Sequence, residues 1–247
     1  MKNQYFGDIR DLFKYDLIQE IMERSPGLKQ VTFIPMLTEN DNRSDGNRRG
    51  IDDKRMQLRP GSQNSELVEY LRKYDAIAPE DRDFRDIGRF FEEKGIRTEI
   101  YHPTDHLTED YFTHGGRHAY FSSIPNDNLH SALVFVDPDK GLEVKKSSEK
   151  HLLHSEVRSL LERMSDDSLL MIYQHFPREK HHDYINRRLQ ELCDNTNADP
   201  LWISDKEIIF FFVAKSDETH TNLEDVLSEY SSRYEKKCQV INGNPPS

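Results

Sequence analysis

Two carboxylates follow an almost wholly apolar segment of the chain. Residues 131–136 are almost wholly apolar, and Asp137, Pro138 and Asp139 come directly after them. Because ligands of open α/β sheets bind beyond the carboxyl ends of the strands, these three residues are candidate catalytic groups. A carboxylate in that place can accept a hydrogen bond from a reacting amine. Two carboxylates together can hold Mg²⁺ for phosphodiester cleavage.

Polar side chains also follow two other predicted strands. Thr38 and Asp41 come after residues 30–37, and His175 comes after residues 168–174. We take Thr38 and Asp41 as candidate cofactor contacts, because they leave the first strand at its carboxyl end. His175 fits a general base and a structural histidine equally well.

These side chains reach one place only if the strands end at the same edge of one sheet. On that condition Asp41, Asp137 and His175 should line a single pocket. Lys14, from the helix that precedes the first strand, should line it too.

Apolar residues follow two different spacings along the chain. Short β-branched and aromatic runs predict strands at residues 30–37, 96–101, 131–136, 168–174, 201–204 and 207–214. Apolar residues at helical spacing predict helices at residues 5–24, 64–74, 80–94, 149–164, 179–193 and 221–237. The alternation predicts an α/β fold with a Rossmann-like, methyltransferase-type sheet that is mostly parallel, has a C-terminal antiparallel hairpin and carries helices on both faces. Residues 1–241 are interpreted as one domain and residues 242–247 as a flexible tail.

The charge of the chain narrows the range of partners. A formal net charge of −11 in 247 residues excludes a general nucleic-acid coat, since most of the surface would repel phosphate. The loop from Arg43 to Arg59 is locally basic and is the candidate nucleic-acid contact. Its interspersed aspartates fit a solvated loop at least as well.

Membrane and export signals are missing from the sequence. The apolar runs are much shorter than the roughly 20 residues that cross a bilayer, and no secretory signal opens the chain. We therefore expect a cytoplasmic protein that does not contact a membrane. Cys193 and Cys238 lack metal-site spacing and are interpreted as free thiols.

The N-terminal segment carries a family resemblance. Residues 5–15, Tyr-Phe-Gly-Asp-Ile-Arg-Asp-Leu-Phe-Lys-Tyr, resemble the opening of the adenine-N6 methyltransferases that modify large-subunit ribosomal RNA. In that family a Gly, an Asn or Asp, an Asp and a Lys occupy the same relative places and lie against S-adenosylmethionine (SAM). The resemblance implies SAM as the cofactor, with Gly7, Asp8, Asp11 and Lys14 at its methionine end.

A second, partial match follows residues 131–136. The family has Asp-Pro-Pro-Tyr at this strand end, and its acidic side chain and a proline carbonyl accept hydrogen bonds from the target amine. The resemblance implies this role for Asp137 and the Pro138 carbonyl. Asp139 replaces the second proline, and Lys140 replaces the aromatic residue that would stack on a flipped base.

Two further comparisons bear on the function. Residues 137–143, Asp-Pro-Asp-Lys-Gly-Leu-Glu, together with the Tyr-Phe-Gly-Asp opening, are similar to a wider group of uncharacterised prokaryotic and phage proteins. After the first strand, however, SAM enzymes have a glycine-rich turn that lets the backbone approach the cofactor. Residues 38–47 hold a single glycine, Gly46.

Three functions follow from these patterns. The first is a SAM-dependent methyltransferase that acts on an amino group of a nucleic-acid base, and the retained N-terminal motif favours it. The second is a Mg²⁺-dependent nuclease of a phage-defence system, with Asp137, Asp139 and Glu143 as metal ligands. The third is a methyltransferase-like fold that has lost SAM and serves as a binding module, and the weak glycine turn favours it.

Four histidines on predicted helices are interpreted as surface residues: His151, His154, His181 and His182.

Overall fold

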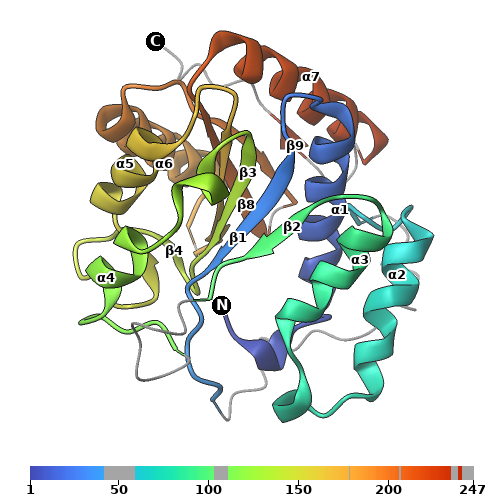
Figure 1. Ribbon diagram of the computed structural model, residues 1–247. Helices are drawn as coiled ribbons and strands as arrows, with labels where there is room; N and C mark the ends of the chain where they lie inside the picture. Colours follow the sequence, from blue (N-terminus) through green and yellow to red (C-terminus); the bar gives the residue numbers. More distant parts are fainter. Residues whose placement is uncertain (42–58, 103–110, 178, 206, 235–238, 241–247) are drawn as a thin grey trace.

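The computed structural model describes residues 1–41, 59–102, 111–177, 179–205, 207–234 and 239–240. Within these residues one twisted sheet crosses the molecule, and helices pack on both of its faces (Figure 1). The sheet is formed by β1 (Gln30–Pro35), β2 (Thr98–Ile100), β3 (Ala132–Asp137), β6 (Leu169–His175), β7 (Leu201–Ser204), β8 (Ile208–Ala214) and β9 (Gln239–Val240). The fold is α/β and Rossmann-like, which confirms the predicted class.

The order of strands across the sheet is β2-β1-β3-β6-β8-β7-β9. β2, β1, β3 and β6 run parallel, and Phe33 of β1 lies between Ile100 and Phe135 of its two neighbours. Phe135 in turn lies opposite Met171 of β6. The prediction that the four apolar runs form parallel neighbours in one sheet is therefore confirmed.

An antiparallel hairpin follows the parallel strands, as predicted. β8 runs antiparallel to both β6 and β7. Asp205 makes the turn between β7 and β8, because its Oδ1 accepts the N–H groups of Glu207 and Ile208 at 2.9 and 3.0 Å. β9 adds an antiparallel edge strand to β7 that the sequence pattern did not predict.

Each face of the sheet packs against its own set of helices. One face carries α1 (Ile9–Arg24), α2 (Ser65–Arg72), α3 (Ile87–Glu93) and α7 (Asp217–Arg233), and the other carries α4 (Arg117–Ser122), α5 (His154–Arg163) and α6 (His181–Thr196). β3 shows why both faces are apolar: Leu133 and Phe135 join the first hydrophobic cluster. The alternate residues Val134 and Val136 join the second.

The first helix begins four residues later than predicted. A 3₁₀ helix at Asn3–Tyr5 precedes a turn, and α1 starts only after Asp8, whose side chain caps it. Gly7 makes this turn possible, because its φ of 81° is one that residues with a side chain rarely adopt. The turn directs the N-terminal motif toward the edge of the sheet.

Two other predicted helices are shorter than the sequence pattern indicated. Residues 80–94 begin with 3₁₀ turns at Pro79–Asp81 and Phe84–Asp86, and only Ile87–Glu93 is α-helical. The break lies at Asp83, whose carboxylate accepts the N–H of Arg85 instead of leaving it to a continuous helix.

Residues 149–164 form a short strand, β5 (His151–Leu152), before α5. β5 pairs in parallel with β4 (Gly141–Leu142) in a separate two-stranded sheet. Neither short strand was predicted, and α4 was not predicted either.

The remaining helices lie close to their predicted places. Asn64 caps α2 and Ser216 caps α7, so α7 begins before the predicted residue 221. The predicted tail at residues 242–247 lies outside the described residues. Within the described parts of the chain, every helix is too short or too polar to span a bilayer.

Candidate functional site

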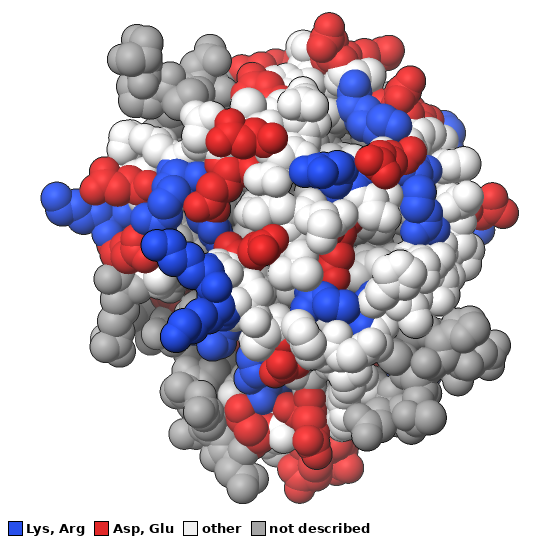
Figure 2. All heavy atoms as spheres, turned by 90° about the vertical axis from the view of Figure 1, so that its left-hand side faces the viewer, with Lys and Arg blue, Asp and Glu red and all other residues white. Residues whose placement is uncertain are grey.

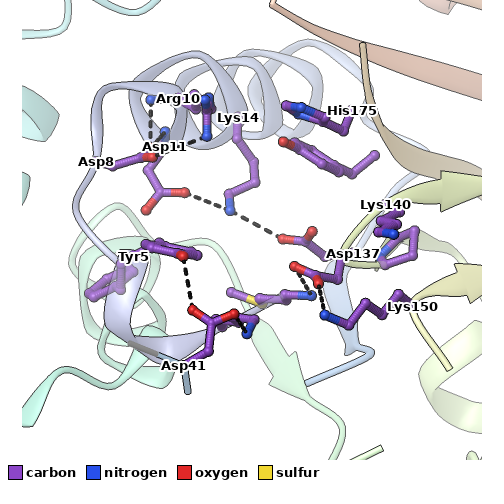
Figure 3. Close-up of a pocket in the computed structure, with 16 residues that line it drawn as sticks. Tyr5, Asp8, Arg10, Asp11, Lys14, Asp41, Asp137, Lys140, Lys150 and His175 are labelled. Carbon is purple, nitrogen blue, oxygen red and sulfur yellow. Dashed lines mark hydrogen bonds and ion pairs between the residues drawn. The ribbon is translucent and has the colours of Figure 1, made fainter. Parts of the chain in front are cut away.

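A pocket of about 300 Å³ lies at the carboxyl ends of β1, β3 and β6 (Figure 3). This edge of the sheet is where the topology of an open α/β fold places a ligand. The pocket is lined by Met1, Lys2, Tyr5, Phe6, Asp8, Arg10, Asp11, Lys14, Asp41, Asp137, Pro138, Asp139, Lys140, Lys150, Tyr173 and His175.

The pocket brings together residues that are far apart in the sequence. Lys14, Asp41, Asp137 and His175 all line it, which confirms the predicted convergence of three strand ends and the first helix. Four more of the candidate residues line it as well: Asp8, Asp11, Pro138 and Asp139.

Lys14 lies between two carboxylates at the base of the pocket (Figure 3). Its Nζ is 2.6 Å from Asp11 Oδ1 and donates a 3.2 Å hydrogen bond to Asp137 Oδ2. Burial on its own would lower the pKa of Lys14, but the charges of Asp11 and Asp137 raise it well above the ordinary lysine value. Lys14 is therefore a fixed positive charge that joins α1 to the end of β3.

The turn before α1 holds the next two acids. Gly7 donates its N–H to Asp11 Oδ2 at 2.8 Å, so Gly7 orients Asp11 and does not itself line the pocket. Asp8 Oδ1 accepts the N–H groups of Arg10 and Asp11 at the start of the helix. Burial, assisted by the charge of Asp11, raises the pKa of Asp8 to about 7. Asp8 is therefore close to half-protonated at neutral pH.

Asp139 has its own positive partners at the mouth of the pocket. Lys150 Nζ lies 3.3 Å from Asp139 Oδ2, and the terminal ammonium of Met1 lies 3.8 Å from Oδ1. Burial raises the pKa of Asp139, but the neighbouring ammonium groups, chiefly those of Met1 and Lys150, outweigh it and hold the pKa below the usual aspartate value.

Asp41 is held by the N-terminal segment. Lys2 Nζ donates to Asp41 Oδ2 at 2.6 Å. The side-chain amide of Gln4 and the hydroxyl of Tyr5 donate to Asp41 Oδ1 at 3.2 and 3.4 Å. Asp41, beyond the end of β1, is therefore held by the side chains of Lys2, Gln4 and Tyr5.

Thr38 does not line the pocket, although Met1, which it contacts, does. Its N–H and its hydroxyl both donate to the carbonyl of Met1, at 2.9 and 3.2 Å. Thr38 thus fixes the N-terminal segment beside β1 and does not line the cavity.

Sequence reasoning missed several residues of the pocket, and Arg10 and Tyr173 stand out among them. A signal for Tyr173 was present, because side chains two positions apart on a strand share a face and His175 was already expected in the pocket. No sequence signal pointed to Arg10. The helix was predicted to start at Tyr5, so the turn at Gly7, which positions the residues after it, was not predicted.

One buried amide fixes the loop that follows Asp137. Gln174 Nε2 donates to the Lys140 carbonyl at 2.9 Å, and Gln174 Oε1 accepts the N–H of Leu142 at 2.8 Å. Gly141, between them, has a φ of 109°, and a Cβ at this position would overlap the Gln174 amide. The end of β6 therefore determines where the loop with Pro138, Asp139 and Lys140 lies.

The three predicted nuclease ligands do not come together in the pocket. Glu143 does not line the pocket, and its Oε2 accepts the N–H of His154 at 2.9 Å. Asp137 and Asp139 are each bonded to a lysine. Within the described residues there is no group of three histidine, cysteine, aspartate or glutamate side chains that could hold a metal ion. Glu143 therefore does not join Asp137 and Asp139 in this pocket, and we derive no reaction through Mg²⁺.

The prediction of surface histidines is wrong for His151. The residue lies in β5 and is buried, because the pairing of β5 with β4 draws it inward, and its Nδ1 accepts the N–H of Ser148. His154 begins α5 and is half-buried. Of the two histidines at the start of α6, His182 is exposed, and His181 packs against Phe176.

Most of the candidate nucleic-acid loop lies outside the described residues. Arg59, its last residue, is described, and its Nη2 lies 2.7 Å from Glu207 Oε1. Figure 2 shows the side of the molecule that is on the left in Figure 1, where lysine and arginine side chains alternate with aspartate and glutamate. The described part of this side therefore forms no continuous positive surface of the kind that binds a phosphate backbone.

Comparison of the chain with protein-family models, with curated proteins and with solved structures finds no match.

Proposed function

We propose that the chain is a SAM-dependent methyltransferase-like protein that acts on an amino group of a nucleic-acid base. One observation carries the proposal. Lys14 belongs to the N-terminal motif and Asp137 to the strand-end motif of the family resemblance, and the two lie 3.2 Å apart in one pocket. Methyl transfer requires the donor and the acceptor in one site, so the two motifs must meet for the reaction to occur.

The charges of the pocket suit the methionine end of SAM. A zwitterion needs carboxylates near its ammonium group and cations near its carboxylate, and the pocket offers both. Asp11 and Asp41 supply negative groups, Asp8 supplies a partly charged one, and Lys14 supplies a fixed positive one. When bound, SAM would supply the reactive methyl group on its sulfonium, and the protein would align it with the acceptor.

Asp137 is suited to orient the acceptor amine. Its Oδ2 is bonded to Lys14, and within the described residues no hydrogen bond reaches its Oδ1. An amine that donates to Oδ1 would meet a carboxylate already held in place by Lys14. The Pro138 carbonyl would accept the second N–H, as the resemblance implies. Alignment of this kind contributes through the effective concentration of the reacting groups.

A second function is favoured by the contacts of Asp41. Lys2, Gln4 and Tyr5 all bond to its carboxylate, at the place where a SAM enzyme brings a glycine turn to the cofactor. A methyltransferase-like binding module that does not transfer a methyl group agrees with this arrangement.

Calorimetric titration with SAM, combined with transfer of labelled methyl groups to RNA and to DNA, tests the proposal. We expect the wild type to bind SAM and to methylate one of these substrates. Asp137→Asn should bind SAM with unchanged affinity and lose transfer. Asp225→Asn, an exposed change on α7, should bind SAM and transfer methyl groups as the wild type does. SAM binding without transfer would support the binding module. No SAM binding by the wild type would contradict the methyltransferase.

A further inference from the structure

Arg10 places an unsatisfied guanidinium in the wall of the pocket. Its side chain is 17% exposed, and its Nε is buried without a hydrogen-bond partner. The nearest acidic oxygens are Asp8 Oδ2, 3.7 Å from Nη1, and Glu207 Oε2, 3.8 Å from Nε. Both distances exceed hydrogen-bond length. Within the described residues the side chain therefore makes no hydrogen bond, and a buried Nε without a partner costs free energy.

The two acids near Arg10 make their hydrogen bonds through their other oxygens, and Asp8 Oδ2 and Glu207 Oε2 face Arg10 only at ion-pair distance. Glu207 Oε1 is bonded to Arg59 at 2.7 Å. Asp8 caps α1 through two backbone N–H groups, and its pKa of about 7 leaves it only partly charged at neutral pH. Arg10 thus keeps its positive charge, and its donors remain available to a ligand.

Tyr173 adds a second donor on the same wall. Its ring packs edge-on against Phe210, with the ring centroids 6.0 Å apart, and this contact fixes its direction. Within the described part of the chain its hydroxyl has no hydrogen-bond partner, and burial raises its pKa so that the hydroxyl keeps its proton. Arg10 and Tyr173 both line the pocket.

We propose that Arg10 and Tyr173 form a binding subsite for an oxyanion, a carboxylate or a phosphate carried by the ligand. A guanidinium offers two parallel N–H groups that match the oxygens of either anion, and the phenol supplies a third donor from a different direction. His175 lies on the same side of the pocket as Arg10, in the upper part of Figure 3. The subsite goes beyond the proposed function, because it requires an anionic group on the ligand and holds whether or not that ligand is SAM.

The carboxylate of SAM and the phosphate of a nucleotide are the two sources of such an anion. They are separated by titrating the full-length protein with SAM, with decarboxylated SAM and with inorganic phosphate. The variants are Arg10→Gln, Arg10→Lys and Tyr173→Phe. Arg89→Gln on α3, where the arginine is exposed and far from the pocket lining, is the matched control. Thermal unfolding checks that each variant folds.

We expect Arg10→Gln to weaken binding of the anionic probe at least tenfold, Tyr173→Phe several-fold, and Arg89→Gln not at all. Arg10→Lys should bind the anionic probe more tightly than Arg10→Gln does, since lysine keeps the positive charge but lacks the two parallel N–H groups of the guanidinium. If SAM is the source, the wild type prefers SAM to decarboxylated SAM, and Arg10→Gln removes the preference. If phosphate is the source, Arg10→Gln weakens phosphate binding and leaves the ratio of the two SAM affinities unchanged.

The subsite and the methyltransferase proposal can fail separately. A wild type that binds phosphate but not SAM, with phosphate binding lost in Arg10→Gln, supports the subsite and contradicts SAM as the cofactor. A wild type that binds SAM and decarboxylated SAM equally and does not bind phosphate overturns the subsite alone. Equal affinities of Arg10→Gln and Arg89→Gln for every probe also overturn it. If Arg10→Gln does not fold, Tyr173→Phe and Arg10→Lys decide by the same criteria.

Discussion

Lys14 and Asp137 are separated by 123 positions in the sequence and by 3.2 Å in the pocket. Both side chains are buried, and Lys14 also holds Asp11. A single ammonium group thus bridges two carboxylates where α1 crosses the end of β3. The consequence for stability is specific, because removing one member of a buried ion pair leaves the other members unpaired.

Lys14→Met should destabilise the fold strongly at neutral pH. It leaves Asp11 and Asp137 buried without their cation, a change that costs about 3 kcal/mol or more. Urea unfolding at neutral pH measures the effect. Lys146→Met, an exposed lysine outside the pocket, is the control, and an equal loss in the two variants would contradict the assignment.

Asp8 should make stability fall as pH rises. Its pKa of about 7 in the folded state lies above the ordinary aspartate value of 3.8, so between these values the folded protein binds a proton that the unfolded chain has released. The contribution is fully present below about pH 4 and is lost as pH rises through 7, with a slope of about 1 kcal/mol per pH unit.

Asp8→Asn tests this dependence because asparagine keeps the helix cap but cannot ionise. As pH rises from about 5 to 8, the unfolding free energy of the wild type should fall relative to that of Asp8→Asn. A difference that stays constant over this interval, in parallel chemical denaturation series, would show that Asp8 does not titrate as described.

The parallel sheet was predictable because its strands are continuous apolar runs, and burial on both faces demands such runs. The convergence of Lys14, Asp137 and His175 followed from the rule that parallel strands end at one edge. The role of Arg10 was not predictable, because it depends on the turn at Gly7. β4 could not be predicted either, because a strand of two residues has no periodicity. Its position is fixed by the side chain of Gln174, which is distant in the sequence.

Asp137 and Asp139 should respond differently to loss of charge, although only one residue separates them. Asp139 pairs with Lys150 near the mouth of the pocket, so Asp139→Asn should cost less than about 1 kcal/mol and, under the proposed function, leave methyl transfer intact. Asp137→Ala should abolish transfer, because the acceptor amine loses its hydrogen-bond acceptor. Thermal unfolding measured beside the transfer assay separates the two roles. Full activity in Asp137→Ala would defeat the catalytic assignment.

Gly141→Ala should destabilise the protein because it inserts a methyl group against the Gln174 amide. The backbone at residue 141 has a φ of 109°, which already disfavours any side chain, and the added Cβ would overlap the amide that bonds to Lys140 and Leu142. We expect a loss of about 2–4 kcal/mol, combining backbone strain with the broken hydrogen bonds. Gly27→Ala is the control for a glycine that has open space around it.

A double-mutant cycle separates the two causes. Gln174→Ala removes the amide that the new methyl group would strike, so Gly141→Ala should cost clearly less in that background, and only the backbone strain should remain. Urea unfolding of the wild type, the two single variants and the double variant gives the coupling energy, expected at about 1 kcal/mol or more. Strictly additive losses would mean that Gln174 does not hold the loop, and that the position of Pro138 and Asp139 in the pocket is set by other contacts.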